Sequence, residues 1–132
     1  MNRLNPEDFR REWFRRFVPE SRRELARAWC FPKGERAPDG TKNDHLWHAF
    51  GWRYIDCLEG AAARAAFLRR VEKEQGEGKK PLLYKEHENA LCEWDFDVES
   101  LGTDMYITAP DFRWTYCTGD ESGIMGPYFA RI

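Results

Sequence analysis

The chain has 132 residues, of which 42% are hydrophobic, 15% aromatic and 33% charged, and its formal net charge is −2. A chain of this length can bury one core without disulfides or metals, and six Trp, nine Phe and five Tyr exclude a disordered protein. Composition therefore predicts one folded domain over residues 1–132. The charged start and the lack of a long apolar stretch exclude a signal peptide and a membrane span, so we expect a cytoplasmic protein.

Charge is distributed unevenly along the chain. Residues 1–36 carry ten Lys or Arg against six Asp or Glu, residues 37–85 carry nine against seven, and residues 86–132 carry two against ten. The last third therefore has a balance of −8, and its acids alternate with apolar residues. This pattern predicts a folded domain with one negative face. For any single acid, ordinary solvation of a sheet surface is the simpler explanation.

Two helices are predicted in the N-terminal segment, residues 1–36. Asn5 can cap the first helix and Pro6 fits its first position. The apolar residues of this helix recur at every fourth position, as on one helix face. They are Phe9, Trp13 and Phe17. Ser21 and Glu24 have the spacing of a capping box for a second helix. Its expected inner residues are Leu25, Ala28 and Trp29. A loop is predicted over residues 33–44.

The sheet-containing part is predicted over residues 44–132. Residues 45–58, HLWHAFGWRYIDCL, fit either a strand or a helix, and their aromatic content favours the strand. A helix follows over residues 59–80, ending between Gly76 and Gly78. Its expected inner residues are Ala63, Phe67 and Val71.

Further strands are predicted over residues 81–87, 92–98, 104–109, 112–118 and 126–132. Within residues 92–98, alternation assigns Trp94, Phe96 and Val98 to the core and the acids between them to solvent. The short links between strands indicate an antiparallel meander with helices on one face. The expected fold class is therefore α+β, with an antiparallel sheet of about five to six strands packed against two to three helices.

Motifs of the common enzyme classes are absent from the sequence, which has no G-x-G-x-x-G, P-loop, G-x-S-x-G or H-E-x-x-H. The nearest approach to a metal cluster is Asp44, His45 and His48, with His87 and Cys92 elsewhere. On a strand, His45 and His48 would point to opposite faces. We therefore expect no structural metal, no cofactor and no catalytic residue. Acids interrupt the arginines of the first helix, which disfavours nucleic-acid binding.

The four cysteines lie far apart and include no C-x-x-C pair. They are Cys30, Cys57, Cys92 and Cys117. A chain without an export signal and with an ample aromatic core does not need disulfides. We expect buried, reduced thiols, because zinc sites usually bring their ligands in closer pairs.

Three segments carry a resemblance to a known family. In chain order they are HLWHAFGW at 45–52, LEGAAARAAF at 58–67 and DMYITAPDFRWTYCTGDESGIMGPYF at 104–129. Together they resemble a small bacterial family of unknown function with W-H-x-F and W-T-Y…G-P-Y-F motifs, outside the two N-terminal helices. Members look like cytoplasmic immunity proteins encoded beside secreted toxins, so the resemblance implies such a role. The family's T-H-E is replaced by Thr118-Gly119-Asp120-Glu121, which removes the best reason to expect catalysis in that loop.

Two main hypotheses follow. The first is a binding protein, most concretely an immunity protein that neutralises a basic toxin domain through its acidic face. The candidate contacts are Glu93, Asp95, Asp97, Glu99, Asp104, Asp120 and Glu121. The second is a small hydrolase-like enzyme that uses His45, His48 or His87, which would have to converge in a pocket. A housekeeping domain is a third alternative. Convergent histidines would favour the enzyme, and a flat acidic sheet face would favour the binding protein.

Overall fold

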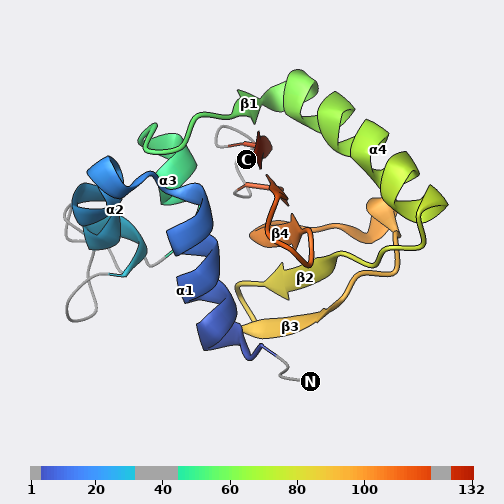
Figure 1. The fold of residues 1–132 in the computed structure, drawn as a ribbon, viewed down its shortest axis with the longest axis horizontal. Helices are drawn as coiled ribbons and strands as arrows, with labels where there is room; N and C mark the ends of the chain where they lie inside the picture. Colours follow the sequence, from blue (N-terminus) through green and yellow to red (C-terminus); the bar gives the residue numbers. More distant parts are fainter. Residues whose placement is uncertain (1–3, 32–44, 120–125) are drawn as a thin grey trace.

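The computed structural model of the chain describes residues 4–31, 45–119 and 126–132 (Figure 1). The helices are α1 (Pro6–Phe17), α2 (Arg23–Cys30), α3 (His48–Gly51) and α4 (Gly60–Gly76), with short 3-10 turns η1 (Glu20–Arg22) and η2 (Val98–Ser100). The strands are β1 (Leu58–Glu59), β2 (Leu82–Lys85), β3 (Ala90–Glu93), β4 (Met105–Thr108), β5 (Trp114–Cys117) and β6 (Tyr128–Arg131).

The six strands form one antiparallel sheet in the order β1-β6-β5-β4-β2-β3. This confirms the α+β class and the expected number of strands. The sheet is not a simple meander, because β2 pairs with both β3 and β4. The chain therefore leaves β3 at the sheet edge and returns on the far side of β2 to form β4.

Both faces of the sheet are covered by helices, so the expectation of helices on one face only is wrong. Successive strand residues point to opposite faces, and each face has its own core. One core contains side chains of α1, α2 and α3 together with Tyr84, Tyr106, Cys117 and Tyr128. The other contains side chains of α4 together with Leu83, Ile107, Trp114, Tyr116 and Phe129. Figure 1 shows α1 and α4 on opposite sides of the strands.

Helix α1 forms as its sequence predicts. The Asn5 side chain accepts a hydrogen bond from the Asp8 backbone N–H at 2.8 Å, and Pro6 opens the helix. Phe9 and Trp13 are fully buried. The Trp13 indole also donates a hydrogen bond to the Thr115 hydroxyl at 2.9 Å, which joins α1 to β5.

Helix α2 presents a different face from the expected one. Ala26 and Cys30 are buried, whereas Leu25 is 65% exposed, Ala28 is exposed and Trp29 is only partly buried. The reason is that α2 follows η1 without a break. A 3-10 turn has about three residues per turn rather than 3.6, so it shifts the inward face of the following helix.

Residues 45–58 contain a helical turn and not the expected long strand. The Ala49 carbonyl accepts a hydrogen bond from the Tyr54 N–H at 2.8 Å, which folds the chain back after α3. Phe50 is fully buried and its ring stacks on Tyr128, with the ring centroids 4.9 Å apart. This contact forms with Phe50 in a helical turn. It therefore selects the helix over the strand, the two conformations that the sequence of residues 45–58 leaves open.

The predicted strand over residues 92–98 ends where β3 ends. Trp94 is buried as expected, but Phe96 is only partly buried and has a left-handed φ of 65°. The Asp97 N–H donates to the Asp95 side chain at 3.1 Å, a short turn typical of Asp. This turn ends the strand, so the acids do not lie on the outer face of a flat strand. The expected alternation of burial continues, because Phe96 and Val98 pack partly buried against the core that holds Trp94, and the acids between them are exposed.

Helix α4 has the expected inner residues Ala63, Phe67 and Val71, and one that was not expected, Glu74. The Glu74 carboxylate is buried, where it accepts a hydrogen bond from the Trp114 indole at 2.8 Å. Of the helices described, none is long and apolar enough to cross a membrane.

All four cysteines are free thiols. Cys30 and Cys117 are buried, as expected, and Cys57 is half-buried. Cys92 is exposed, against expectation, because it lies on the edge strand β3.

Candidate functional site

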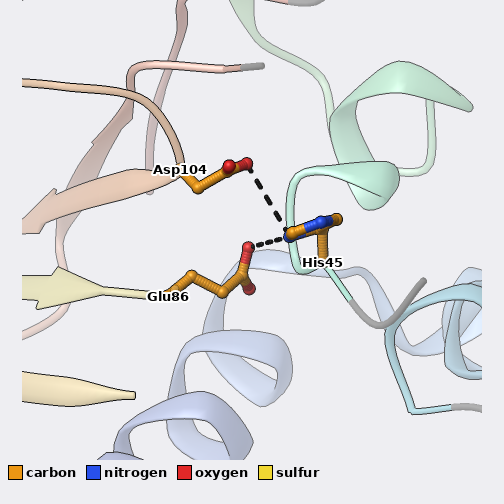
Figure 2. A group of neighbouring side chains, drawn as sticks. All are labelled: His45, Glu86 and Asp104. Carbon is orange, nitrogen blue, oxygen red and sulfur yellow. Dashed lines mark hydrogen bonds and ion pairs between the residues drawn. The ribbon is translucent and has the colours of Figure 1, made fainter. Parts of the chain in front are cut away.

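The three histidines of the chain meet at one end of the sheet. His45 lies just before α3, His48 opens α3, and His87 lies in the turn after β2. The ring centroid of His45 is 6.1 Å from that of His48 and 6.2 Å from that of His87. Two carboxylates, Glu86 and Asp104, lie beside His45 (Figure 2), and Asp104 also faces His87. We call His45, Glu86, His87 and Asp104 the histidine–carboxylate cluster.

Glu86 joins four parts of the chain through its carboxylate, and its side chain is only 4% exposed. One oxygen accepts hydrogen bonds from the Arg10 guanidinium at 2.8 Å and the Leu46 N–H at 2.9 Å. The other accepts from His45 Nδ1 at 2.6 Å and the Tyr106 hydroxyl at 2.9 Å. Glu86 therefore fixes α1, the segment before α3 and β4 to the end of β2.

Asp104 is the second buried carboxylate, with a side chain that is 6% exposed. Its backbone is left-handed, with a φ of 52°, and its N–H donates to the Gly119 carbonyl at 2.8 Å. One carboxylate oxygen accepts from the Trp47 indole and lies 3.7 Å from His45 Nδ1. The other faces Nε2 of His87. A non-glycine residue held in this conformation by its surroundings is a common feature of functional sites.

One guanidinium accompanies the two buried carboxylates. Burial of the Arg10 guanidinium disfavours its charged form and by itself would lower its pKa. The neighbouring Glu86 carboxylate acts in the opposite direction, and the pKa of Arg10 is raised above its ordinary value. Burial, and then Glu86, raise the pKa of Tyr106 well above the ordinary value, so that its hydroxyl remains a donor. Arg10 offsets the charge of Glu86. Asp104 forms no ion pair with a Lys or Arg side chain among the described residues, and its oxygens face the Trp47 indole and the rings of His45 and His87.

The cluster has the chemistry of a metal site or of an oriented base. His45 and His87 each direct one ring nitrogen at a carboxylate, an arrangement that fixes the tautomer and the ring orientation. One ligand atom each from His45, Glu86 and Asp104 lies within 4.8 Å of the other two. Imidazole and carboxylate ligands together suit divalent transition metals.

Of the candidate contacts, Glu93 is the last residue of β3, the edge strand at the opposite end of the strand order from β1. Asp95, Asp97 and Glu99 follow in the segment that leads from β3 through η2. All four are exposed. Among the described residues, the only ion pair to any of them joins Glu93 to Lys80 at 3.8 Å. We call these four residues the acidic edge.

Asp104 does not belong to that surface, which corrects its place among the expected partner contacts. It is buried in the histidine–carboxylate cluster, where its carboxylate is already bonded. Asp120 and Glu121 lie outside the described residues. His45 and His48, which on a strand would point to opposite faces, converge instead, and His87 joins them. This convergence is the outcome stated above as favouring the enzyme hypothesis, and the acids after β3 do not form the flat sheet face stated as favouring the binding protein.

Glu86 was not found from the sequence, because its place in the cluster depends on strand pairing. Lys85 of β2 lies opposite Met105 of β4, so the residue after β2 meets the residue before β4. The Glu86 N–H accordingly donates to the Asp104 carbonyl at 3.0 Å. The proximity of the two acids follows from pairing of β2 with β4, and local sequence patterns do not reveal that pairing.

Comparison with known proteins places the chain in a family. No curated protein and no solved structure matches it. A family model does match, over residues 7–129, and it includes α1 and α2, which lie outside the segments of the initial resemblance. The chain therefore belongs to the family described as domain of unknown function DUF4275.

Proposed function

We propose that this chain is a binding protein whose acidic edge recognises a basic protein. One observation carries the proposal: four exposed carboxylates follow one another at the end of the edge strand β3 and in the segment after it, and within the described residues only Glu93 forms an ion pair. Exposed carboxylates that form no ion pair, or only a long one, are available to cations on another molecule. They raise the rate of encounter with a basic surface, over a range set by a Debye length of about 8 Å at physiological ionic strength.

The partner that fits best is a toxin domain with a basic cleft for nucleic acid. An acidic protein that occupies such a cleft blocks the substrate and is steered to it by the same field. The chain would then act as an immunity protein in the cytoplasm. A different use of the same acids is protection of the edge strand β3 against pairing with other sheets. Neutralising the acids would then cause aggregation and would leave partner association unchanged.

The test begins with capture of the partner from the native host on the tagged chain, followed by stopped-flow measurement of association at low and physiological salt. In the variant Asp95→Asn, Asp97→Asn, Glu99→Gln we expect association to slow about tenfold at low salt, within the range of electrostatic steering, and its salt dependence to flatten.

A matched control removes three exposed acids elsewhere. The variant Glu20→Gln, Glu24→Gln, Glu72→Gln changes the net charge equally, so it separates a local effect from an effect of total charge. Equal slowing in the two variants, or none in either, would contradict recognition through the acidic edge.

A second candidate function is binding of a divalent metal ion by the histidine–carboxylate cluster. It is favoured by the three ligand atoms of His45, Glu86 and Asp104 that lie within 4.8 Å of one another. An ion there would replace the hydrogen bond between His45 Nδ1 and Glu86, which lie 2.6 Å apart. Binding should therefore weaken as pH falls, because protons compete for the ligands.

Calorimetric titration with Zn²⁺ and Mn²⁺ tests this function. We expect one ion per chain, lost in Asp104→Asn and retained in Glu88→Gln, which removes an exposed acid from the turn next to the cluster. Circular dichroism establishes that Asp104→Asn remains folded. Stoichiometric binding that survives in the folded Asp104→Asn variant would exclude the cluster as the site.

A further inference from the structure

A pocket lined by basic side chains lies far from the histidine–carboxylate cluster. This pocket of about 710 Å³ is formed by α4, β1, β5, β6 and the segments that flank the strands. Trp114 and Arg131 lie opposite each other at one end of the β5–β6 pair, whereas the cluster lies beyond Met105 at the other end of β4. The pocket and the cluster therefore occupy opposite ends of the strands.

Five cationic side chains line this basic pocket. They are Arg69, Arg70, Lys73, Arg113 and Arg131. The first three lie within about one turn of α4. The last two come from neighbouring strand ends, and a backbone hydrogen bond from the Ile132 N–H to the Arg113 carbonyl, at 2.8 Å, holds these ends together. Arg113 and Arg131 are the only basic residues of the acidic segment 86–132, and both lie here.

Local acids offset only part of this charge. Arg70 lies 3.4 Å from the Glu74 carboxylate, and Arg113 lies 3.4 Å from that of Asp111. In the described part of the chain no ion pair joins a carboxylate to the three other cations. Those three are Arg69, Lys73 and Arg131. The pocket therefore holds an excess of positive charge in a protein whose net charge is −2.

We propose that the basic pocket binds a small phosphorylated organic molecule of about nucleotide size. Its volume lies within the range of about 300–1,000 Å³ typical of small-ligand sites. Arginine side chains bind phosphate oxygens through paired N–H groups. Leu58 and Ile132, both exposed, and the underlying Phe129 provide apolar contacts for the organic part of the ligand.

The surroundings favour a compact anion over an extended polyanion. Asp56 lines the pocket and Asp111 lies beside Arg113, and both carboxylates are exposed. A nucleic-acid strand that ran beyond the pocket would meet these negative charges. A ligand whose charges end within the pocket would not.

Calorimetric titration of the intact chain tests the proposal with five probes. These are pyrophosphate, adenosine 5′-triphosphate, fructose 1,6-bisphosphate, uncharged adenosine and a single-stranded RNA oligomer. We expect the two phosphate esters to bind, adenosine not to bind, and pyrophosphate to bind more weakly than the tighter of the two esters. Comparison of the esters distinguishes a nucleotide from a sugar phosphate as the source of the phosphate.

The variant Arg69→Gln, Arg131→Gln removes two exposed cations that have no ion pair among the described residues. We expect it to raise the dissociation constant of the better ester at least tenfold without changing the melting temperature. The control Arg11→Gln, Arg16→Gln removes two exposed cations from α1, on the other face of the sheet, and should change that constant less than twofold. Equal weakening in both variants, no binding of either ester, or tighter binding of the RNA oligomer than of either ester would overturn the proposal.

Discussion

Replacement of Glu86 by glutamine removes a charge and keeps the size of the side chain. The carboxylate accepts two hydrogen bonds at each oxygen, from Arg10, Leu46, His45 and Tyr106. An amide replaces one of these oxygens by an NH₂ group, which cannot accept. Two of the four donors would then face another donor, and the buried guanidinium would lose its counter-charge.

The size of the effect follows from burial. The side chains of Arg10 and Glu86 are 8% and 4% exposed, and breaking a buried ion pair by removal of one partner costs about 3–5 kcal/mol. Loss of two hydrogen bonds to a charged group, at about 1.5–3 kcal/mol each, gives a similar total. Because a domain of this kind is stable by about 5–15 kcal/mol, Glu86→Gln should remove a large part of its free energy of unfolding.

Urea unfolding, followed by tryptophan fluorescence and circular dichroism, measures this loss. The matched control is Glu12→Gln, because Glu12 also bonds two arginines, Arg15 at 2.6 Å and Arg16 at 2.7 Å, but on the surface of α1. Surface pairs contribute about 0.2–1 kcal/mol. A loss in Glu86→Gln no greater than that in Glu12→Gln would refute the assignment of Glu86 as the residue that holds these elements together.

Three further predictions concern the core and the thiols. Phe67 is fully buried and its ring stacks on that of Tyr116 in β5. Phe67→Ala should therefore lower the free energy of unfolding in urea by about 3–5 kcal/mol, and Leu68→Ala, at a more exposed position, should lower it much less. Similar losses in the two variants would contradict the placement of α4. Burial raises the pKa of the Cys30 thiol from 9.0 to about 12 and also raises that of Cys117. The unfolded chain loses these protons from about pH 9 while the folded chain keeps them, so stability should fall as pH rises above 9, by up to about 1.4 kcal/mol per pH unit for each thiol; a folded Cys30→Ala variant with an unchanged slope would contradict this. In the folded protein a thiol reagent should modify exposed Cys92 fastest and reach Cys30 and Cys117 only on unfolding, and early modification of either would show that the core is open.

Local sequence signals predicted those elements whose tertiary contacts agree with them. Helix α1 has a cap, a proline at its first position and one apolar stripe, and all three act in the structure. Helix α4 similarly buries Ala63, Phe67 and Val71. The alternating aromatic segments of β4, β5 and β6 are strands, since each of their faces meets a separate core.

Elements were predicted wrongly where distant contacts decide the conformation. The aromatic residues of residues 45–58 fit a strand and a helix equally, and packing of Phe50 against Tyr128 selects the helix. In the segment after β3, the left-handed backbone of Phe96 ends the expected strand early, although Phe96 and Val98 still pack against the expected core. No local pattern marks that position, because a positive φ is uncommon for an aromatic residue.

The candidate site depends on topology more than on any motif. Glu86 and Asp104 meet because β4 pairs with β2 on the side away from β3, and His45 joins them because α3 packs over the same end of the sheet. A meander, which is the simplest arrangement of successive strands, would have separated the two acids. The histidines could be proposed from the sequence, but their carboxylate partners could not.

The basic pocket and the acidic edge belong to one sheet, and their separation decides whether they can influence each other. Arg113 of the pocket directly precedes β5, and Glu93 of the acidic edge is the last residue of β3. Three steps between strands of about 4.8 Å separate β5 from β3, which makes about 14 Å. That distance is nearly two Debye lengths at physiological ionic strength but less than the Debye length of about 30 Å at 0.01 M. An anion in the basic pocket should therefore alter association at the acidic edge much more at low salt than at physiological salt. An effect of the same size at both salt concentrations would require a change in structure between the two sites, since the screened field alone would not produce it.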